Sequence, residues 1–294
     1  MAKKYAGVYP PLIERLLTEE GHKKDPDKAV KTKLHQIYGA YIQANAYKKS
    51  AAILKSLVEY DFPGGHPTGN PNNLMAEMER AHYGRLATVN TLLALHASTN
   101  ERLPYYFDFY DFILRQTGQV ASIMDIGCGY NPFSLPYIEA VWAHITKAHC
   151  SKSDPPDPRI DLEAYYAYDI DTRVADLINR FFYEMDLPQY AKCADLVEYI
   201  PPEQADIALM LKLLPVLEAQ SPGSGFRLAR ELNARYLVIT YPLKSLGGRE
   251  KGMEQHYSAI FEKALADGEL GKFTPVSQQQ IGPEMLYLLE TANI

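Results

Sequence analysis

Cysteine is scarce in this sequence, and the few cysteines form no recognisable pattern. The 294 residues include only Cys128, Cys150 and Cys193, which are widely separated. A set this small excludes a disulfide framework and a zinc site built from paired cysteines. We therefore expect a reducing, cytoplasmic setting and no bound metal.

Long hydrophobic runs are also missing. No apolar run reaches the roughly 18 residues that a membrane-spanning helix needs, and Met1-Ala2-Lys3-Lys4 leads into no signal-peptide core. We expect no membrane contact. The composition, 47% hydrophobic and 22% charged, is ordinary for a globular protein. A chain of this length can form one large domain or two small ones with a substantial core.

The net charge is −6, but positive charge is concentrated at the start of the chain. Residues 1–60 hold eleven Lys and Arg against six Asp and Glu, so this part carries +5 and the remainder −11. A basic segment joined to an acidic body is typical of a phosphate-binding module attached to an enzyme. A solvated helical face would give the same pattern, so no single lysine supports phosphate binding by itself. The interpretation depends on the whole cluster: Lys3, Lys4, Lys23, Lys24, Lys31, Lys33, Lys48 and Lys49.

Hydrophobic spacing predicts a helical region over residues 1–112. Val30, Leu34 and Ile37 recur at helical spacing after Asp25-Pro26, which is a suitable helix start. His35, on the same helix, is expected to be a buried histidine. The other helices expected in this part cover about residues 12–17, 44–60, 73–97 and 105–116.

Residues 113–294 show a different pattern, in which short apolar runs alternate with helical stretches. This alternation predicts an α/β domain, with a parallel sheet covered by helices on both faces. The strands expected are residues 120–125, 165–169, 191–196, 207–211 and 236–240.

A glycine turn, Gly127-Cys128-Gly129, follows the first expected strand. Ligands of parallel sheets bind beyond the carboxyl ends of the strands, where glycine lets the backbone approach them closely. The turn alone would also suit a dinucleotide. Two features favour S-adenosylmethionine. Asp125, just before the turn, suits a ligand with an ammonium group, and Pro132 stands where a dinucleotide fingerprint has its third glycine.

Carboxylates also follow the second and third expected strands. Asp169, with Ile170, would lie near ribose hydroxyls, whereas Asp171 is also suited to cap the next helix. Asp195 can accept a hydrogen bond from an adenine amino group, and Leu196 can pack on the ring. Three acids at three successive strand ends predict a nucleoside-type cofactor.

Five blocks of sequence are recognisable together: KLHQIYGAY (33–41), HASTNERLP (96–104), DIGCGYNPFSLP (125–136), LKLLPVLE (211–218) and ITYPLKSLGGR (239–249). With them the chain resembles the aminoglycoside-resistance 16S rRNA methyltransferases of the Arm/Rmt group, which modify a decoding-site guanosine at N7. Residues 147–166 form an insertion relative to that group.

The resemblance implies a fold, a reaction and a partner. The fold would be that of a class I S-adenosylmethionine-dependent methyltransferase, Rossmann-like with a seven-stranded, mostly parallel sheet and an all-helical N-terminal extension. The enzyme would act on 16S rRNA in the 30S ribosomal subunit, with no obligate protein partner, and release S-adenosylhomocysteine. In this family the modification confers resistance to 4,6-disubstituted deoxystreptamine aminoglycosides such as kanamycin.

Individual residues take roles from the same resemblance. Arg102 would bind the carboxylate of the cofactor, Gly127 and Gly129 would line its methionine part, and Gln220 would border the methyl group. The residues that the resemblance implies at the methyl-transfer centre are Lys212, Lys244 and Arg249, and those implied to contact the target nucleotide from the adjoining loop are Ser245, Lys251 and Met253.

The expected chemistry agrees with what the sequence lacks. Guanine N7 has a lone pair and no proton, so its methylation needs no general base. Accordingly, the chain has no Asn/Asp-Pro-Pro-Tyr/Phe motif for an exocyclic amine and no cysteine placed to attack a pyrimidine. Two alternatives remain open: methylation of another rRNA site, such as an adenine N1, or cofactor binding with little turnover. The intact block 245–253 favours an enzyme.

Overall fold

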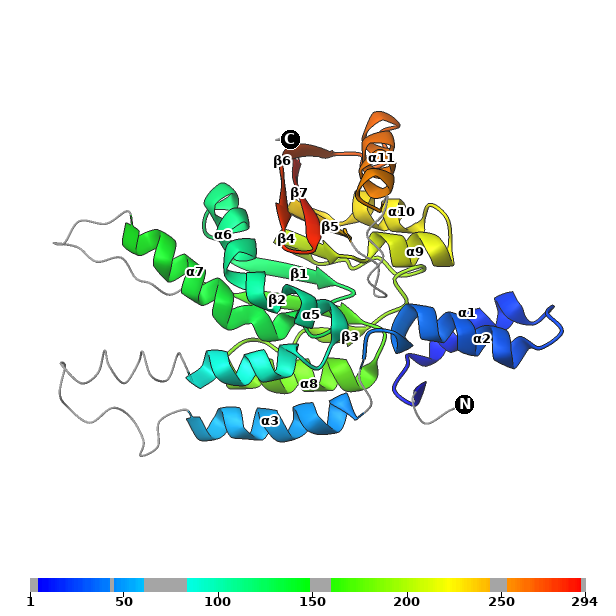
Figure 1. The fold of residues 1–294 in the computed structure, drawn as a ribbon, viewed down its shortest axis with the longest axis horizontal. Helices are drawn as coiled ribbons and strands as arrows, with labels where there is room; N and C mark the ends of the chain where they lie inside the picture. Colours follow the sequence, from blue (N-terminus) through cyan, green and yellow to red (C-terminus); the bar gives the residue numbers. More distant parts are fainter. Residues whose placement is uncertain (1–4, 43–44, 61–83, 149–159, 244–252, 292–294) are drawn as a thin grey trace.

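The computed structural model describes residues 5–42, 45–60, 84–148, 160–243 and 253–291 (Figure 1). In these ranges seven strands form one sheet in the order β3-β2-β1-β4-β5-β7-β6. β1 to β5 run parallel, and β7 and β6 are added antiparallel. The predicted seven-stranded, mostly parallel sheet is confirmed. The strands are β1 (Ser122–Ile126), β2 (Ala164–Asp169), β3 (Ala191–Cys193), β4 (Gln204–Leu211), β5 (Asn233–Pro242), β6 (Phe273–Ile281) and β7 (Glu284–Thr291).

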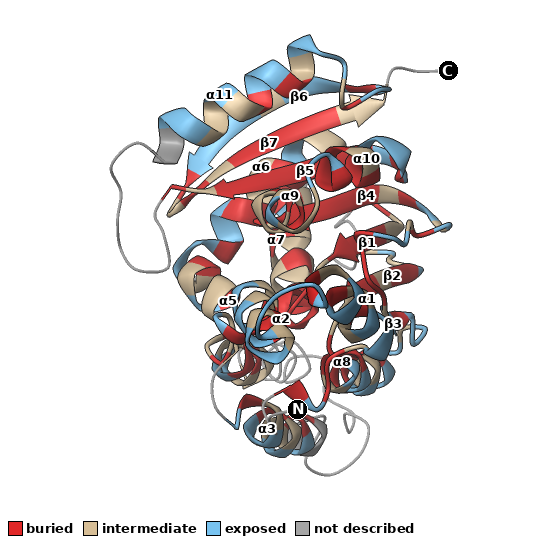
Figure 2. Ribbon diagram, turned by 90° about the vertical axis from the view of Figure 1, so that its right-hand side faces the viewer, coloured by how far each residue is buried: buried red, intermediate tan, exposed pale blue. Residues whose placement is uncertain are grey.

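The two faces of the sheet have separate apolar cores, because successive strand residues point to opposite faces. Ile123 of β1 and Val238 of β5 belong to one core, whereas their neighbours Met124 and Leu237 belong to the other. Figure 2 shows the central strands buried between the helical layers. The first face is covered by α6 (Tyr106–Thr117), α7 (Leu135–Ala148) and α8 (Thr172–Glu184), and α3 (Ala46–Tyr60) packs against α8 on the side away from the sheet (Figure 1). The second face is covered by α9 (Leu214–Gln220), α10 (Ser224–Glu231) and α11 (Met253–Ala266).

The first helices form a small unit, which we call the N-terminal hairpin: α1 (Pro10–Glu20), α2 (Pro26–Leu34) and a π-helical turn, η2 (His35–Gly39). The hairpin has an apolar cluster of its own, which includes Leu12 and Leu34. Asp25 caps α2 as predicted, since its carboxylate accepts a hydrogen bond from the backbone N–H of Lys28 at 3.1 Å. The hairpin lies beyond the carboxyl end of β2, where Tyr9 donates its N–H to the carbonyl of Ile170 at 2.7 Å (Figure 1).

Some expectations differ from the structure. The helix expected over residues 73–97 is described from residue 84, ends at residue 93, and is followed by a turn before α5 (Ala97–Arg102) and the 3-10 turn η3 (Leu103–Tyr105). His35 is exposed, so the expectation of a buried histidine was wrong: the apolar stripe of this helix passes through Val30, Leu34 and Tyr38, and His35 lies beside it. Part of the predicted insertion, 149–159, lies outside the described residues. Along the described part of the chain, no helix combines the length and the apolar character needed to cross a membrane.

Candidate active site

A cavity lies at the carboxyl ends of β1, β2 and β4, between the sheet and the N-terminal hairpin. Leu12 of α1 and Ile37 of η2 contribute to its wall on the hairpin side. On the sheet side the structure brings together nine residues that the sequence singled out for the cofactor or the methyl-transfer centre: Arg102, Gly127, Gly129, Asp169, Ile170, Asp195, Leu196, Lys212 and Gln220.

The glycine turn after β1 is tightly packed. Gly127 and Gly129 have φ angles of 65° and 51°, in the left-handed region that glycine adopts without strain. A β-carbon on Gly129 would lie 2.9 Å from Cε1 of His96, and one on Gly127 would lie 2.7 Å from Cδ1 of Leu213. Both glycines are therefore required by conformation and by space, and their backbone forms the floor of the cavity.

Two strand-end carboxylates reach the cavity. The Asp169 carboxylate accepts hydrogen bonds from the backbone N–H of Gly129 and of Asp171, both at 2.9 Å. Burial raises the pKa of Asp169 to about 6, although these backbone bonds lower it. The Asp195 carboxylate is buried, and it is paired with Arg15 of α1. These acids lie side by side because the parallel strands β2 and β3 end at the same edge of the sheet.

Asp125 occupies a different position from the other two acids. Its carboxylate is 1% exposed, is not part of the cavity wall, and accepts hydrogen bonds from Asn131 at 2.8 Å and Tyr165 at 2.9 Å. Burial raises its pKa to about 7. In this structure Asp125 therefore holds Asn131 beneath the glycine turn, and its contact with a cofactor stays a prediction.

A buried charge cluster lies next to the glycine turn. Arg102 donates from Nη2 to Oε2 of Glu284 at 2.8 Å and from Nη1 to Oδ1 of Asn131 at 3.2 Å. Glu284 also pairs with Nζ of Lys212 at 3.2 Å. Burial alone would raise the pKa of Glu284, but Arg102 and Lys212 outweigh it and hold this pKa below its ordinary value. Among the described residues, Arg102 Nε has no hydrogen-bond partner, so one guanidinium donor remains for a ligand.

Lys212 enters this cluster through an unusual backbone conformation. Its φ is 57°, a left-handed value that is rare for a residue with a side chain and costs on the order of 1–3 kcal/mol. The Lys212 N–H donates to the carbonyl and the hydroxyl of Thr240 at 3.1 and 3.0 Å, which holds the turn in place. Its ammonium donates to Oε2 of Glu101 at 2.6 Å. The turn thus places a buried, paired cation on the cavity wall.

His96 packs over the glycine turn. Its ring stacks between Tyr41 and Tyr130, with centroid distances of 6.1 and 5.6 Å. Burial, together with the nearby charges of Arg102 and Lys212, lowers the pKa of His96 to about 4, so the ring is neutral near pH 7. Within the described part of the chain its Nδ1 atom has no hydrogen-bond partner. The cavity therefore has a second polar atom available to a ligand.

The predicted RNA-contacting residues differ in how the structure places them. Lys24 and Lys31 of the hairpin region and Lys48 and Lys49 of α3 are exposed. Lys23 pairs with Glu20, and Lys33 pairs with Glu19 and Glu20 at 2.9 Å each, so their charges are partly neutralised. Lys3, Lys4, Lys244, Ser245, Arg249 and Lys251 lie outside the described residues. Met253, expected in a loop, is the first residue of α11.

Sequence reasoning missed several residues of the cavity region. His96 and Glu101 belong to a recognised block, HASTNERLP, but were given no role. Glu284 stands in no motif, and it reaches Arg102 only because β7 pairs with β5. The hairpin residues on the cavity wall could not be distinguished from core residues in the sequence. Apolar residues that cover a cavity recur along a helix at the same spacing as apolar residues that enter a core.

Comparison with known proteins identifies a family and several relatives that this chain resembles. The chain matches the family described as ribosomal RNA methyltransferase (FmrO) over residues 1–151 and 160–287. The internal stretch left unmatched, 152–159, lies within the segment that the sequence predicted to be an insertion. The chain is 32% identical to a 16S rRNA (guanine(1405)-N(7))-methyltransferase from Serratia marcescens, over 98% of this chain and 94% of the relative. It is 29% identical to one from Micromonospora echinospora, over 98% and 93%.

Solved structures give the same result. The 16S rRNA methyltransferase RmtF in complex with S-adenosyl-L-homocysteine is 30% identical, with a TM-score of 0.73 over 99% of this chain and 94% of that one. The 16S rRNA methylase RmtB is 27% identical, with a TM-score of 0.69 over 99% and 94%. The similarity therefore covers both the hairpin and the sheet.

Proposed function

Because the chain belongs to the FmrO family of ribosomal RNA methyltransferases, we propose that it uses S-adenosylmethionine to methylate N7 of guanosine 1405 in 16S rRNA. One observation carries this proposal from the structure. A single cavity combines a glycine turn, two strand-end carboxylates and the guanidinium of Arg102. This is the set of groups that an amino-acid nucleoside requires.

The residues of the cavity fit the cofactor. Asp169 would accept hydrogen bonds from the ribose hydroxyls, and Asp195 from the adenine amino group, while Leu196 packs on the ring. Arg102 would bind the carboxylate, and its unpartnered Nε supports this role. When bound, S-adenosylmethionine supplies an electrophilic methyl group on its sulfonium centre. We propose that no metal takes part.

The chain's own contribution to the reaction would be to orient the reactants. Guanine N7 has no proton to lose, so no residue needs to act as a base, and catalysis would come from proximity and alignment. The Glu101 and Glu284 partners of Lys212 hold its ammonium at the cavity wall. Lys244, Ser245, Arg249 and Lys251 would contact the displaced guanosine, as would Met253 at the start of α11.

The N-terminal residues would provide the contact with the ribosome. We propose that residues 1–112 dock on the 30S subunit without an obligate protein partner, and that residues 113–294 form the methyltransferase domain. The exposed lysines of the hairpin region and α3 would bind backbone phosphates. These contacts would offset the free energy of roughly a few kcal/mol that displacement of the base requires.

Cofactor binding should depend on pH through Asp169. We expect the affinity for S-adenosylhomocysteine, measured by isothermal titration calorimetry, to be level above about pH 7 and to fall as pH decreases to 5. With a pKa of about 6, the Asp169 carboxylate is ionised at pH 7 and becomes protonated below pH 6, which removes acceptors for the ribose hydroxyls. The Asp169→Asn variant should bind S-adenosylhomocysteine weakly, and its affinity should change little with pH. An affinity that still falls at low pH in this variant would assign the effect to Asp125 instead.

The proposed activity can be tested in bacteria that express the protein. We expect high resistance to kanamycin without resistance to apramycin, and reverse-transcription mapping should locate one modified guanine in the 16S rRNA. Cells with an empty vector are the control for resistance. Resistance to both drugs would indicate the neighbouring adenine as the target. The absence of both resistance and modification, from a protein that still binds S-adenosylhomocysteine, would contradict the proposed target.

A further inference from the structure

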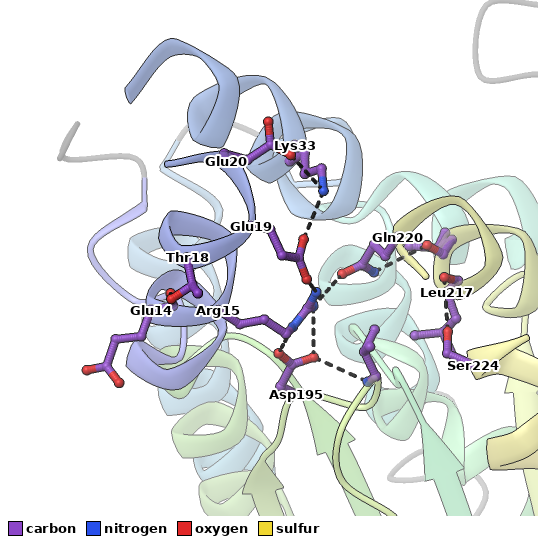
Figure 3. A network of polar contacts seen from close by, with 12 residues as sticks. Glu14, Arg15, Thr18, Glu19, Glu20, Lys33, Asp195, Leu217, Gln220 and Ser224 are labelled. Carbon is purple, nitrogen blue, oxygen red and sulfur yellow. Dashed lines mark hydrogen bonds and ion pairs between the residues drawn. The ribbon is translucent and has the colours of Figure 1, made fainter. Parts of the chain in front are cut away.

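An arginine of the N-terminal hairpin contacts the proposed adenine site. Arg15 of α1 donates from Nε to Oδ2 of Asp195 at 2.6 Å and from Nη2 to Oδ1 at 3.1 Å (Figure 3). The two side chains are 13% and 8% exposed. A bidentate, largely buried pair of this kind is among the strongest polar contacts that proteins make. It joins elements that are 180 residues apart in the sequence.

Further contacts hold Arg15 in this position. Arg15 donates from Nη1 to Oε1 of Glu19 at 2.7 Å and from Nη2 to Oε1 of Gln220, at the end of α9, at 3.0 Å (Figure 3). Glu19 is itself bound by Lys33 of α2 at 2.9 Å. The polar network thus runs from α2 through α1 to Asp195 and α9, and both Asp195 and Gln220 are part of the cavity wall.

The Asp195 carboxylate keeps the capacity to bind a ligand. An ionised carboxylate offers about four acceptor positions. Arg15 uses two of them, and the backbone N–H of Val197 uses a third, at 3.2 Å from Oδ1. About one position remains for an adenine amino group. Because the other three are occupied by fixed donors, the orientation of that last acceptor is fixed before the ligand arrives.

The hairpin contacts the ribose side of the cavity as well. The hydroxyl of Tyr38 in η2 donates to Asp171, and the Asp171 N–H donates to the Asp169 carboxylate at 2.9 Å. Val8, just before α1, forms a β-bridge with Asp171. The hairpin is therefore attached at the ends of both β2 and β3, and it forms part of the cofactor cavity as well as of the proposed docking region.

We propose that Arg15 is a positioning residue of the cofactor site: it orients Asp195 for the adenine amino group and, through the same pair, seats the N-terminal hairpin against the cavity. This inference rests on the proposed function. The hairpin carries part of the proposed RNA-binding surface. Binding of the cofactor and binding of the 30S subunit therefore favour the same position of the hairpin against the cavity. Each ligand consequently increases the affinity of the protein for the other.

Calorimetry with S-adenosylhomocysteine tests the positioning role on the full-length protein without RNA. Arg15→Met should weaken binding about tenfold, within the range typical of coupled sites. In the Asp195→Asn background the same change should have little further effect, since Arg15 acts through that carboxylate. Arg235→Met is the matched control, because it removes an arginine from an exposed pair with Glu290 on β7 and should leave the affinity unchanged.

Two results would overturn the positioning role. One is an unchanged affinity in Arg15→Met, and the other is a loss that is fully additive with Asp195→Asn, which would indicate a merely structural effect. If Arg15→Met does not fold, Arg15→Lys replaces it; lysine keeps the charge but cannot make the bidentate pair, so partial weakening is expected and unchanged affinity again refutes the role.

The affinity for purified 30S subunits tests the linkage. S-adenosylhomocysteine should increase the affinity of the wild-type protein for 30S subunits about fivefold or more. In Arg15→Met the ligand should no longer change this affinity. An equal effect of the ligand in both proteins, or no effect in the wild type, would refute the linkage. A wild-type protein that binds the ligand but leaves guanosine 1405 unmodified would refute the proposed function alone, since the calorimetric test of Arg15 involves no RNA.

Discussion

Replacement of Arg102 by methionine is expected to weaken the binding of S-adenosylhomocysteine by about ten- to a hundredfold. Hydrogen bonds to a charged group contribute roughly 1.5–3 kcal/mol each, and each tenfold change in affinity corresponds to about 1.4 kcal/mol. The Arg102 guanidinium lines the cavity, is held by Glu284 and Asn131, and keeps Nε unpartnered within the described residues. Methionine has similar length but no donor for the cofactor carboxylate.

The measurement is a calorimetric titration of the folded variant, with thermal unfolding to show that it is folded. Arg115→Met is the matched control, because Arg115 lies on α6 in an exposed pair with Asp111 and is not part of the cavity wall. An affinity for S-adenosylhomocysteine within about threefold of the wild type would contradict the assignment of Arg102 to the cofactor carboxylate.

Replacement of Glu284 by glutamine is expected to lower the free energy of unfolding by about 3–5 kcal/mol at pH 7. Glu284 is 1% exposed and lies between the cations of Arg102 and Lys212, so its neutralisation leaves buried positive charge uncompensated. Its pKa is held below the ordinary value, so the carboxylate contributes this stability above about pH 4.5 and loses it only as pH falls through the lowered pKa.

Urea-induced unfolding provides this value, and Glu290→Gln is the control. Glu290 pairs with Arg235 at 3.1 Å, and the arginine is 60% exposed. Screening by solvent limits such a pair to about 1 kcal/mol or less. Equal small losses of unfolding free energy in the two variants would show that the charge cluster contributes little to the stability of the fold.

The parts of the site that lie at strand ends could be predicted from the sequence. Short apolar runs identify parallel strands, and parallel strands bring their carboxyl ends together, so the position of Asp169 at the cavity follows from its place in the sequence. The same reasoning locates Gly127 and Gly129, whose left-handed backbone and close packing require glycine. Asp125 follows the same rule, but its carboxylate is bonded to Asn131 and Tyr165, and its contact with a cofactor stays a prediction.

Contacts between distant elements could not be predicted. Glu284 enters the site from an antiparallel strand, and Arg15 from a helix at the other end of the chain. Nothing in their local sequence distinguishes them from surface charges, since a helical position at the protein surface and one above a cavity have the same spacing. His35 shows the converse error, because one residue along a helix turns a side chain by about 100° and separates a buried position from an exposed one.

The most direct test of the central claim is methylation of purified 30S subunits with the purified protein and methyl-labelled S-adenosylmethionine. Borohydride reduction followed by aniline cleavage would then locate N7-methylguanosine in the 16S rRNA. We predict one labelled methyl group per subunit and one new cleavage relative to untreated subunits, at guanosine 1405. Unlabelled subunits, or label at another nucleotide or on another atom, would contradict the account.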